Sequence, residues 1–311
     1  MKINIVYHQN MYLEPITPIA EELSKRRYKI LHNSPGGVIT IGSHITDLMK
    51  WKNKTPLVFI DHGVLPRKGN INDIINLIKL NALILFSGKY YERLINKIDP
   101  AYKNFKIIGN PKLEYFLKDQ IPRNQVIKKY DLDPGKPIIL YAPTWYHKAK
   151  HKPYSHGTIK YIKKIEKACM NYNLIVFPHP KDHKKKYIKY ASLIELKDRT
   201  MYYFSASDLL ISDFSTIMID YCYFNKPIIQ ITDVIDRNIR KYKDKQQKYV
   251  KLEVGEFTKA HKLKKIIDLT LKNPDAHKTK REKWFRDVVE IVKGSSKLAA
   301  DIIEEYIRKI K

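Results

Sequence analysis

Hydroxyl and carboxylate side chains follow a short apolar stretch in the second half of this sequence. Residues 209–211 (LLI) have the composition of a buried parallel strand, and Asp213, Ser215 and Thr216 come directly after it. A second apolar stretch with helical character covers 215–224. Backbone N–H groups at a helix start, flanked by hydroxyls, can bind a phosphate or diphosphate. The alternative interpretation is that Ser215 or Thr216 only caps the helix.

Two further predicted strands in this half also end in polar residues. Thr144 and Trp145 follow the apolar residues 138–141, and His179 follows 174–177. Prolines on both sides of His179 restrict the backbone, and Lys181 comes two residues later. This arrangement favours His179 as a hydrogen-bond donor to a phosphate over a role as a base.

Histidines spaced four residues apart raise the question of a metal ion. The pairs are His179 with His183 and His147 with His151. Neither pair combines a suitably placed carboxylate with a helical context, so the sequence predicts no metal and no other cofactor.

Polar residues also follow the strands predicted in the first half, at 3–6, 57–60, 82–86 and 105–108. They are His8, Asp61, His62, Ser87 and Asn110. An imidazole with an ordinary pKa near 6.5 suits a general base, which makes His62 a candidate to take a proton from an attacking hydroxyl. Asp61 can orient that ring, and Arg67 and Lys68 add positive charge. The alternative is a structural histidine at the start of a loop.

Strands alternate with helices along the whole chain, which predicts doubly wound parallel sheets of the α/β class. Ten strands in two groups of five, among them 192–196, predict two Rossmann-like halves with an inter-domain cleft. In such sheets ligands bind at the carboxyl ends of the strands. We expect an N-terminal acceptor-side domain at 1–120 and a nucleotide-donor domain at 121–285. A helical region over 275–310 ends the chain, and we expect 286–311 to cross back to the first domain.

The charge of the chain favours polyanionic partners. The 59 Lys and Arg residues against 32 Asp and Glu give a net charge of +27 over 311 residues. The two cysteines form no disulfide framework, and no stretch approaches the roughly 20 apolar residues of a membrane span. We therefore expect a cytoplasmic globular protein that meets an anionic membrane only at its surface.

Five motifs in order resemble those of the CDP-glycerol:poly(glycerophosphate) glycerophosphotransferases, the teichoic-acid polymerases and primases. DHGVLPRK resembles the family's HGTPLK, and FSGKYYERLI with KIIGNPKLEYF resembles SxxYxxxF…GNPRxD. YAPTWY is similar to YAPTWR, FPHPK to the HP motif, and ISDFSTIMIDYCYFNKPIIQ to TDYSSxxFDxxxxxKP. These elements lie within residues 57–230.

The resemblance implies a GT-B-like fold and the transfer of glycerol phosphate or ribitol phosphate from a CDP-linked donor. The acceptor would be a hydroxyl of a cell-surface polymer or lipid-linked precursor, and CMP would leave. His62 would be the base, assisted by Asp61. The residues implied on the donor side are Thr144, Trp145, His179, Lys181, Asp213, Ser215, Thr216 and Asp220, the last as a ribose contact. The acceptor-side candidates are His8, Arg67, Lys68, Ser87 and Asn110.

Two other interpretations stay open at this stage. One is a different GT-B enzyme, such as a Kdo-transferring capsule enzyme or a UDP-N-acetylglucosamine 2-epimerase, because GNP after a fifth strand also resembles the latter. The other is a nucleic-acid-binding protein, suggested by the charge and by 22 tyrosines. No RNP-like, helix-turn-helix or zinc-finger pattern supports it, so we expect no nucleic-acid partner.

Overall fold

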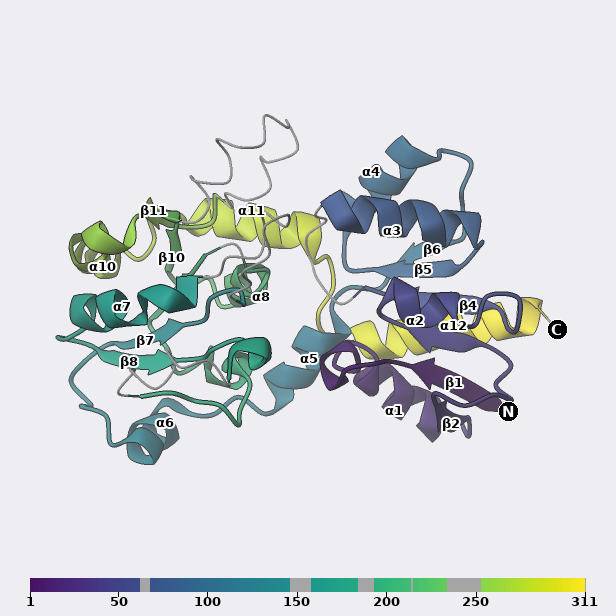
Figure 1. The fold of residues 1–311 in the computed structure, drawn as a ribbon, viewed down its shortest axis with the longest axis horizontal. Coiled ribbons are helices and arrows are strands. Elements are labelled where there is room, and N and C mark those ends of the chain that lie inside the picture. The colour runs from purple at the N-terminus through teal and green to yellow at the C-terminus, as the bar shows by residue number, and fades with distance from the viewer. Residues whose placement is uncertain (62–67, 146–157, 184–192, 214, 234–252, 311) are drawn as a thin grey trace. The chain divides into compact units, whose positions relative to one another are not determined.

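The structure of the chain is a computed structural model that describes residues 1–61, 68–145, 158–183, 193–213, 215–233 and 253–310 (Figure 1). It divides into two compact units. Unit 1 comprises Met1–Lys118 and Arg286–Lys311, and unit 2 comprises Asp119–Phe285. Within the described ranges, no helix combines the length and apolar character needed to cross a membrane.

Unit 1 is built on a six-stranded parallel sheet in the order β2-β1-β3-β4-β5-β6. Its strands are β1 (Lys2–Val6), β2 (Lys29–His32), β3 (Thr40–Gly42), β4 (Leu57–Ile60), β5 (Leu83–Phe86) and β6 (Phe105–Ile107). The chain runs from β1 to β2 on one side and then returns to place β3 on the other side. The strand order therefore reverses between β1 and β3, which is where ligands bind in doubly wound sheets.

Helices cover both faces of this sheet. They are α1 (Thr17–Lys25), α2 (Ile45–Met49), α3 (Lys68–Lys79), α4 (Lys89–Ile98), α5 (Pro111–Lys118) and α12 (Ser295–Lys309), with a 3-10 turn η1 at Asn10–Tyr12. Apolar residues of α1 and α12 form one core with the strands. Residues of α2, α3 and α4 form a second core on the opposite face. The C-terminal helix α12 thus belongs to the core of unit 1.

Unit 2 contains a five-stranded parallel sheet in the order β11-β10-β9-β7-β8. The strands are β7 (Ile138–Tyr141), β8 (Asn173–Val176), β9 (Leu209–Ser212), β10 (Ile228–Ile231) and β11 (Glu256–Thr258). The helices are α6 (Arg123–Tyr130), α7 (Ile162–Ala168), α8 (Ile217–Cys222), α10 (Leu263–Lys272) and α11 (Lys278–Val288), whose last three residues are assigned to unit 1. The 3-10 turns occur at Thr158–Tyr161, Pro180–Asp182, Thr200–Tyr203 and Ala260–Lys262. Apolar residues of α7 and α10 pack on the strands. Here the strand order reverses between β7 and β9.

The two parallel sheets and their flanking helices confirm the predicted α/β class, but two predicted elements need correction and two strands were not predicted. The strand expected at 192–196 is wrong in the described residues, where Ile194 makes only an isolated bridge to Val176. The edge strands β2 and β11 were not predicted, because each is short and carries polar residues. The helical region at 275–310 is two helices, α11 and α12, separated by residues 289–294, and Gly294, with a positive φ of 83°, immediately precedes α12.

Glu114 of α5 holds the start of α12. Its carboxylate accepts hydrogen bonds from the backbone N–H groups of Gly294 at 2.7 Å and Ser296 at 2.8 Å. The hydroxyls of Ser295 and Ser296 also donate to it, at 3.0 and 2.6 Å. A carboxylate at a helix N-terminus is favourable because it satisfies unpaired N–H groups and opposes the helix dipole. Burial acts to raise the pKa of Glu114, but these hydrogen bonds outweigh it and lower the pKa.

We predict that Glu114→Gln lowers the free energy of unfolding by about 1–3 kcal/mol at pH 7, because donors at the α12 start lose a charged acceptor. The folded-state pKa lies below the unfolded one, so this contribution is present above the unfolded pKa and is lost as the pH falls through the folded pKa. Urea unfolding of both proteins at a series of pH values measures it. The exposed Glu21→Gln in α1 is the matched control. Equal stabilities of Glu114→Gln and the parent would contradict the assignment.

Candidate functional site

The carboxyl edge of the unit 2 sheet carries most of the residues predicted to bind a donor. Three neighbouring strands, β9, β7 and β8, end there in a row. Asp213 follows β9, the segment 142–145 follows β7, and the segment 177–181 follows β8. The side chains that sequence reasoning grouped together therefore leave the sheet at adjacent strand ends, around the point where the strand order reverses.

Asp213 is the anchor of this edge. It has no exposed surface. Its Oδ1 accepts from the backbone N–H of Thr144 at 2.9 Å, and its Oδ2 accepts from the N–H and hydroxyl of Thr158 at 2.9 and 3.1 Å. The Tyr141 hydroxyl donates in turn to Thr158 Oγ1 at 3.0 Å. Asp213 was predicted to shape its turn, and the geometry makes it a positioning residue that joins Thr144, after β7, to Thr158, at the start of the next 3-10 turn.

The loop after β7 is held at a second point. Ser212 Oγ donates to the carbonyl oxygen of Ala142 at 2.6 Å. Thr144, in contrast, is only 5% exposed, and its hydroxyl oxygen has no hydrogen-bond partner among the described residues. Buried hydroxyls are nearly always paired, so this group is suited to a hydrogen bond with a bound molecule.

Trp145, His179 and Lys181 lie together beside this loop. The Trp145 and His179 rings are 6.4 Å apart between centroids, and Lys181 Nζ lies 4.7 Å from the centre of the Trp145 ring. The backbone N–H of Lys181 donates to His179 Nδ1 at 3.2 Å. Because Nδ1 accepts, a neutral His179 carries its proton on Nε2, which makes that nitrogen a donor. The cluster thus offers an N–H donor, an ammonium group and an aromatic face.

Ser215 and Thr216 precede α8 and are partly exposed. No side chain caps α8 in the described part of the chain, and Ser215 Oγ lies 3.5 Å from the Ile217 N–H, at the limit of a hydrogen bond. The capping alternative therefore lacks a well-formed bond. Asp220 lies within α8 and is buried, and its predicted contact with a ribose stays a prediction.

The predicted catalytic region falls largely outside the described residues. His62 and Arg67 lie in the segment 62–67, which is not described, and Lys68 begins α3. Asp61 follows β4 and is half-buried, and its N–H donates to the Leu85 carbonyl at 3.2 Å, which extends the pairing of β4 with β5. The assignment of His62 as the base stays a prediction.

Ser87 and Asn110 serve the backbone of unit 1. The Glu290 N–H donates to the Ser87 carbonyl at 3.0 Å, and the Asn110 N–H donates to the Ile291 carbonyl at 2.9 Å. A Cβ at Gly109, whose φ is +82°, would lie 2.0 Å from the Ile291 carbonyl oxygen. The absence of a side chain at the glycine of the GNP motif thus lets the segment that leads to α12 pack against it. Asn110 also caps α5, since its Oδ1 accepts from the Leu113 N–H at 3.0 Å.

His8 follows β1 and lies with two residues that sequence reasoning missed, His44 and Asp47. Sequence reasoning also missed Thr158. Neither the short helix α2 nor the start of the 3-10 turn at Thr158 has a motif that marks it. The spacing of His44, Asp47 and Thr158 along the chain gives no signal either, because only the strand order brings the first two to His8 and Thr158 to Asp213.

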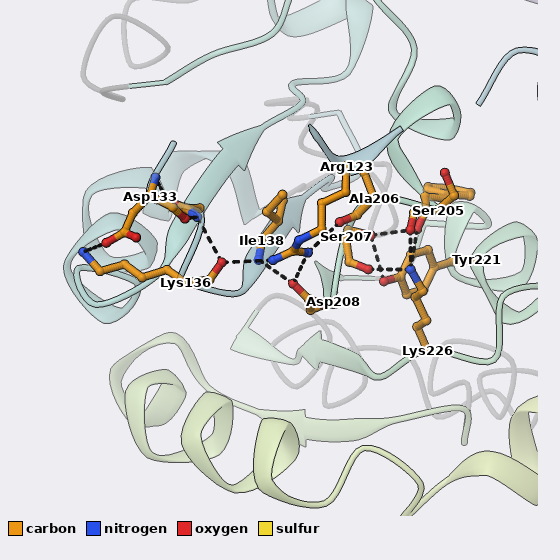
Figure 2. A network of polar contacts seen from close by, with 12 residues as sticks. Arg123, Asp133, Lys136, Ile138, Ser205, Ala206, Ser207, Asp208, Tyr221 and Lys226 are labelled. Carbon is orange, nitrogen blue, oxygen red and sulfur yellow. Dashed lines mark hydrogen bonds and ion pairs between the residues drawn. The ribbon is translucent and has the colours of Figure 1, made fainter. Parts of the chain in front are cut away.

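A separate polar network lies at the amino edge of the unit 2 sheet (Figure 2). Arg123 donates to Asp208 at 2.7 Å, and Asp208 also accepts from the Ile138 N–H at 2.7 Å. Lys226 Nζ donates to the carbonyl oxygens of Ser205 and Ser207, both at 2.7 Å. Burial lowers the pKa of Lys226. Since these residues precede their strands, the lysine of the motif that ends in KP stabilises the fold at the edge opposite the site.

The fold is of the GT-B type, two Rossmann-like units with parallel sheets. It is similar to a solved structure of the wall teichoic acid polymerase TagF, with 15% sequence identity, a TM-score of 0.71, and coverage of 99% of this chain and 89% of the matched chain. Structures of TagF variants match as well, including one soaked with CDPG at a TM-score of 0.66. A UDP-GlcNAc 2-epimerase from Neisseria meningitidis has a TM-score of 0.62 at 11% identity, over 98% of this chain and all of that one.

The chain belongs to the CDP-glycerol:poly(glycerophosphate) glycerophosphotransferase family, whose model matches residues 73–297, more than half of the sequence. This confirms the resemblance seen in the motifs. Over 130 residues it is 28% identical to the teichoic acid ribitol-phosphate polymerases TarK and TarL of Staphylococcus aureus. That stretch covers 36% of this chain, 22% of TarK and 20% of TarL, so the alignment spans less than a quarter of these relatives.

We predict that Asp213→Asn lowers the free energy of unfolding by about 3 kcal/mol. The side-chain NH₂ of Asn would replace one carboxylate oxygen and would then face a backbone N–H donor without an acceptor between them. Ser215→Ala, two residues away, should change the free energy of unfolding by less than about 0.5 kcal/mol, since its hydroxyl makes no close bond in the described structure. Chemical unfolding of the two variants measures this difference. Similar losses in both would contradict the anchoring role of Asp213.

Proposed function

We propose that this protein transfers a polyol phosphate, glycerol phosphate or ribitol phosphate, from a CDP-linked donor to a hydroxyl group, with release of CMP. The acceptor is a cell-surface polymer or a lipid-linked precursor. The observation that carries the proposal is the family match over residues 73–297, which includes the segments with Thr144, His179 and Ser215. The ribitol-phosphate polymerases among the relatives support ribitol as well as glycerol in the donor.

The proposed donor site lies at the carboxyl edge of the unit 2 sheet. Displacement at phosphorus depends on alignment and on neutralising the charge of the phosphoryl oxygens. The Lys181 ammonium supplies positive charge to the diphosphate, and His179 Nε2–H and the Ser215 and Thr216 hydroxyls supply hydrogen-bond donors. Trp145 and the Thr144 hydroxyl line the nucleotide side. Asp213 holds the Thr144 backbone in place without touching the donor.

The acceptor side of the proposal lies in unit 1. His62 takes the proton of the acceptor hydroxyl as it attacks phosphorus, and Asp61 orients its ring. Arg67 and Lys68 provide positive charge for an acceptor that carries phosphate groups. Of these residues Asp61 is described, and it follows β4 at the carboxyl edge of the sheet, where β1 and β5 also end before His8 and Ser87.

The same proposal places the protein at the cytoplasmic face of a membrane. A net charge of +27 attracts a surface of anionic lipids, and each basic side chain near such a surface contributes about 1 kcal/mol. Binding of this kind requires no membrane-spanning helix.

Release of CMP tests the function. Purified protein, a lipid-extract acceptor and either CDP-glycerol or CDP-ribitol should yield CMP with at least one donor. His62→Ala should abolish turnover and leave the Kd for CDP nearly unchanged, because the base does not bind the nucleotide. His179→Ala should weaken CDP binding by at least about tenfold, since a charge-assisted hydrogen bond is worth roughly 1.5–3 kcal/mol.

His261→Ala is the matched control, because His261 is exposed in the 3-10 turn after β11 and is not among the residues assigned to the donor site. Calorimetry with CDP, UDP and a short oligonucleotide runs in parallel. Binding of UDP but not CDP would favour a sugar-nucleotide enzyme such as the 2-epimerases, and binding of the oligonucleotide alone would overturn the transferase proposal.

Vesicle flotation tests the membrane proposal. The protein should float with vesicles that contain phosphatidylserine and remain behind with pure phosphatidylcholine. Raising the salt concentration to about 1 M should release it, because the Debye length shrinks to about 3 Å. Equal flotation with both vesicles, or none with either, would contradict an electrostatic association.

A further inference from the structure

The strand order of the unit 1 sheet reverses between β1 and β3, and three chemically active side chains lie at this point. His8 follows β1, whereas His44 and Asp47 belong to the start of α2 after β3. The two strands pair in parallel, with Val6 opposite Gly42, so both loops leave the same edge of the sheet. Ligands of doubly wound sheets bind in the crevice outside such a reversal.

These side chains converge closely. One ligand atom from each of His8, His44 and Asp47 lies within 4.8 Å of the other two. His8 Nδ1 lies 2.7 Å from Asp47 Oδ2, and the two imidazole rings are 4.8 Å apart between centroids. His44 Nδ1 lies 2.7 Å from Thr46 Oγ1, which fixes the direction of that ring.

The cluster has one buried and one open side. Asp47 is 3% exposed, so its negative charge is removed from water, while the side chain of His8 is 37% exposed. Lys50 Nζ lies 3.7 Å from Asp47 Oδ1 but is itself largely exposed and therefore compensates the carboxylate weakly. Tyr12 packs against both imidazoles, at 4.7 Å from each. Burial and the Asp47 charge raise the pKa of Tyr12, so its phenol stays protonated and forms a wall of the cluster.

We propose that His8, His44 and Asp47 bind a divalent transition-metal ion of the Zn²⁺ class. Two imidazoles and one carboxylate are ligands that Zn²⁺ prefers, whereas Mg²⁺ and Ca²⁺ require mostly oxygen ligands. Bonds of about 2.0–2.2 Å at tetrahedral angles separate ligand atoms by about 3.4 Å. His8 Nδ1 and Asp47 Oδ2, at 2.7 Å, lie closer than this, so the exposed His8 ring would have to shift outward to accommodate the ion.

The ion would replace the proton that His8 now shares with Asp47. The proton of His8 moves from Nδ1 to Nε2 by exchange with solvent, so that a neutral imidazole presents the Nδ1 lone pair, and the metal accepts lone pairs from both imidazoles and the carboxylate. Three protein ligands leave a fourth position for water or another oxygen ligand. The site is independent of the proposed donor chemistry, and it departs from the sequence-based expectation that the chain holds no metal. That expectation considered only histidine pairs close in sequence.

Calorimetry of the full chain with ZnCl₂, after treatment with EDTA, tests the proposal. We expect one site per chain that is weakened at least about tenfold in His8→Ala and in Asp47→Asn. Co²⁺ bound at the same site should show the visible absorption of a tetrahedral complex, lost in both variants. His8→Ala keeps the test decisive, because an exposed side chain can be removed without loss of the fold, which circular dichroism verifies.

His261→Ala is the matched control and should bind Zn²⁺ like the parent, because the other histidines of the chain can contribute weak sites. The proposal is overturned if the parent binds no Zn²⁺, or if His8→Ala and Asp47→Asn bind it with unchanged affinity. It is overturned as well if inorganic phosphate binds to the EDTA-treated protein, Zn²⁺ does not, and His8→Ala abolishes phosphate binding.

Discussion

The Asp213 carboxylate carries its charge at a position without access to solvent. A buried charge costs several kcal/mol unless donors surround it, and here two backbone N–H groups and one hydroxyl do so. Those donors come from the loop after β7 and from the start of the 3-10 turn at Thr158. The charge can therefore be buried only when the segment after β7 and the start of that 3-10 turn adopt their folded positions. This requirement fixes Thr144 and, next to it, Trp145.

The residues of the proposed donor site follow from this constraint. Thr144 is bound to Asp213 directly, and Ser215 and Thr216 come two and three residues after it along the chain. His179 and Lys181 reach the same edge through the neighbouring strand β8, and Lys181 then packs on Trp145. Asp213 thus positions the backbone, whereas His179, Lys181 and the hydroxyls supply the groups proposed to bind the donor. Unit 1 is organised differently. Gly109 leaves room for the segment that leads to α12, and the Asn110 N–H donates to its Ile291 carbonyl oxygen.

The sequence predicted the α/β class and nine of the strands, because buried parallel strands such as 138–141 are continuous apolar runs. It also placed the family motifs at the carboxyl ends of strands. Edge strands such as β2 escaped prediction, since the four residues of β2, KILH, have only two apolar side chains and no alternating pattern. The roles of Asp213 and Thr158 and the convergence of His8 with Asp47 depend on which strands are neighbours. Strand order is a property of the folded sheet, and no local pattern encodes it.

The most direct test of this account is a crystal structure of the protein with CDP-glycerol or CDP-ribitol bound. The account predicts the diphosphate oxygens within hydrogen-bond distance of His179, Lys181 and the Ser215 and Thr216 hydroxyls. Asp213 should remain bonded to Thr144 and Thr158, with no contact to the nucleotide. A nucleotide bound to unit 1, or a direct bond between Asp213 and the donor, would contradict it.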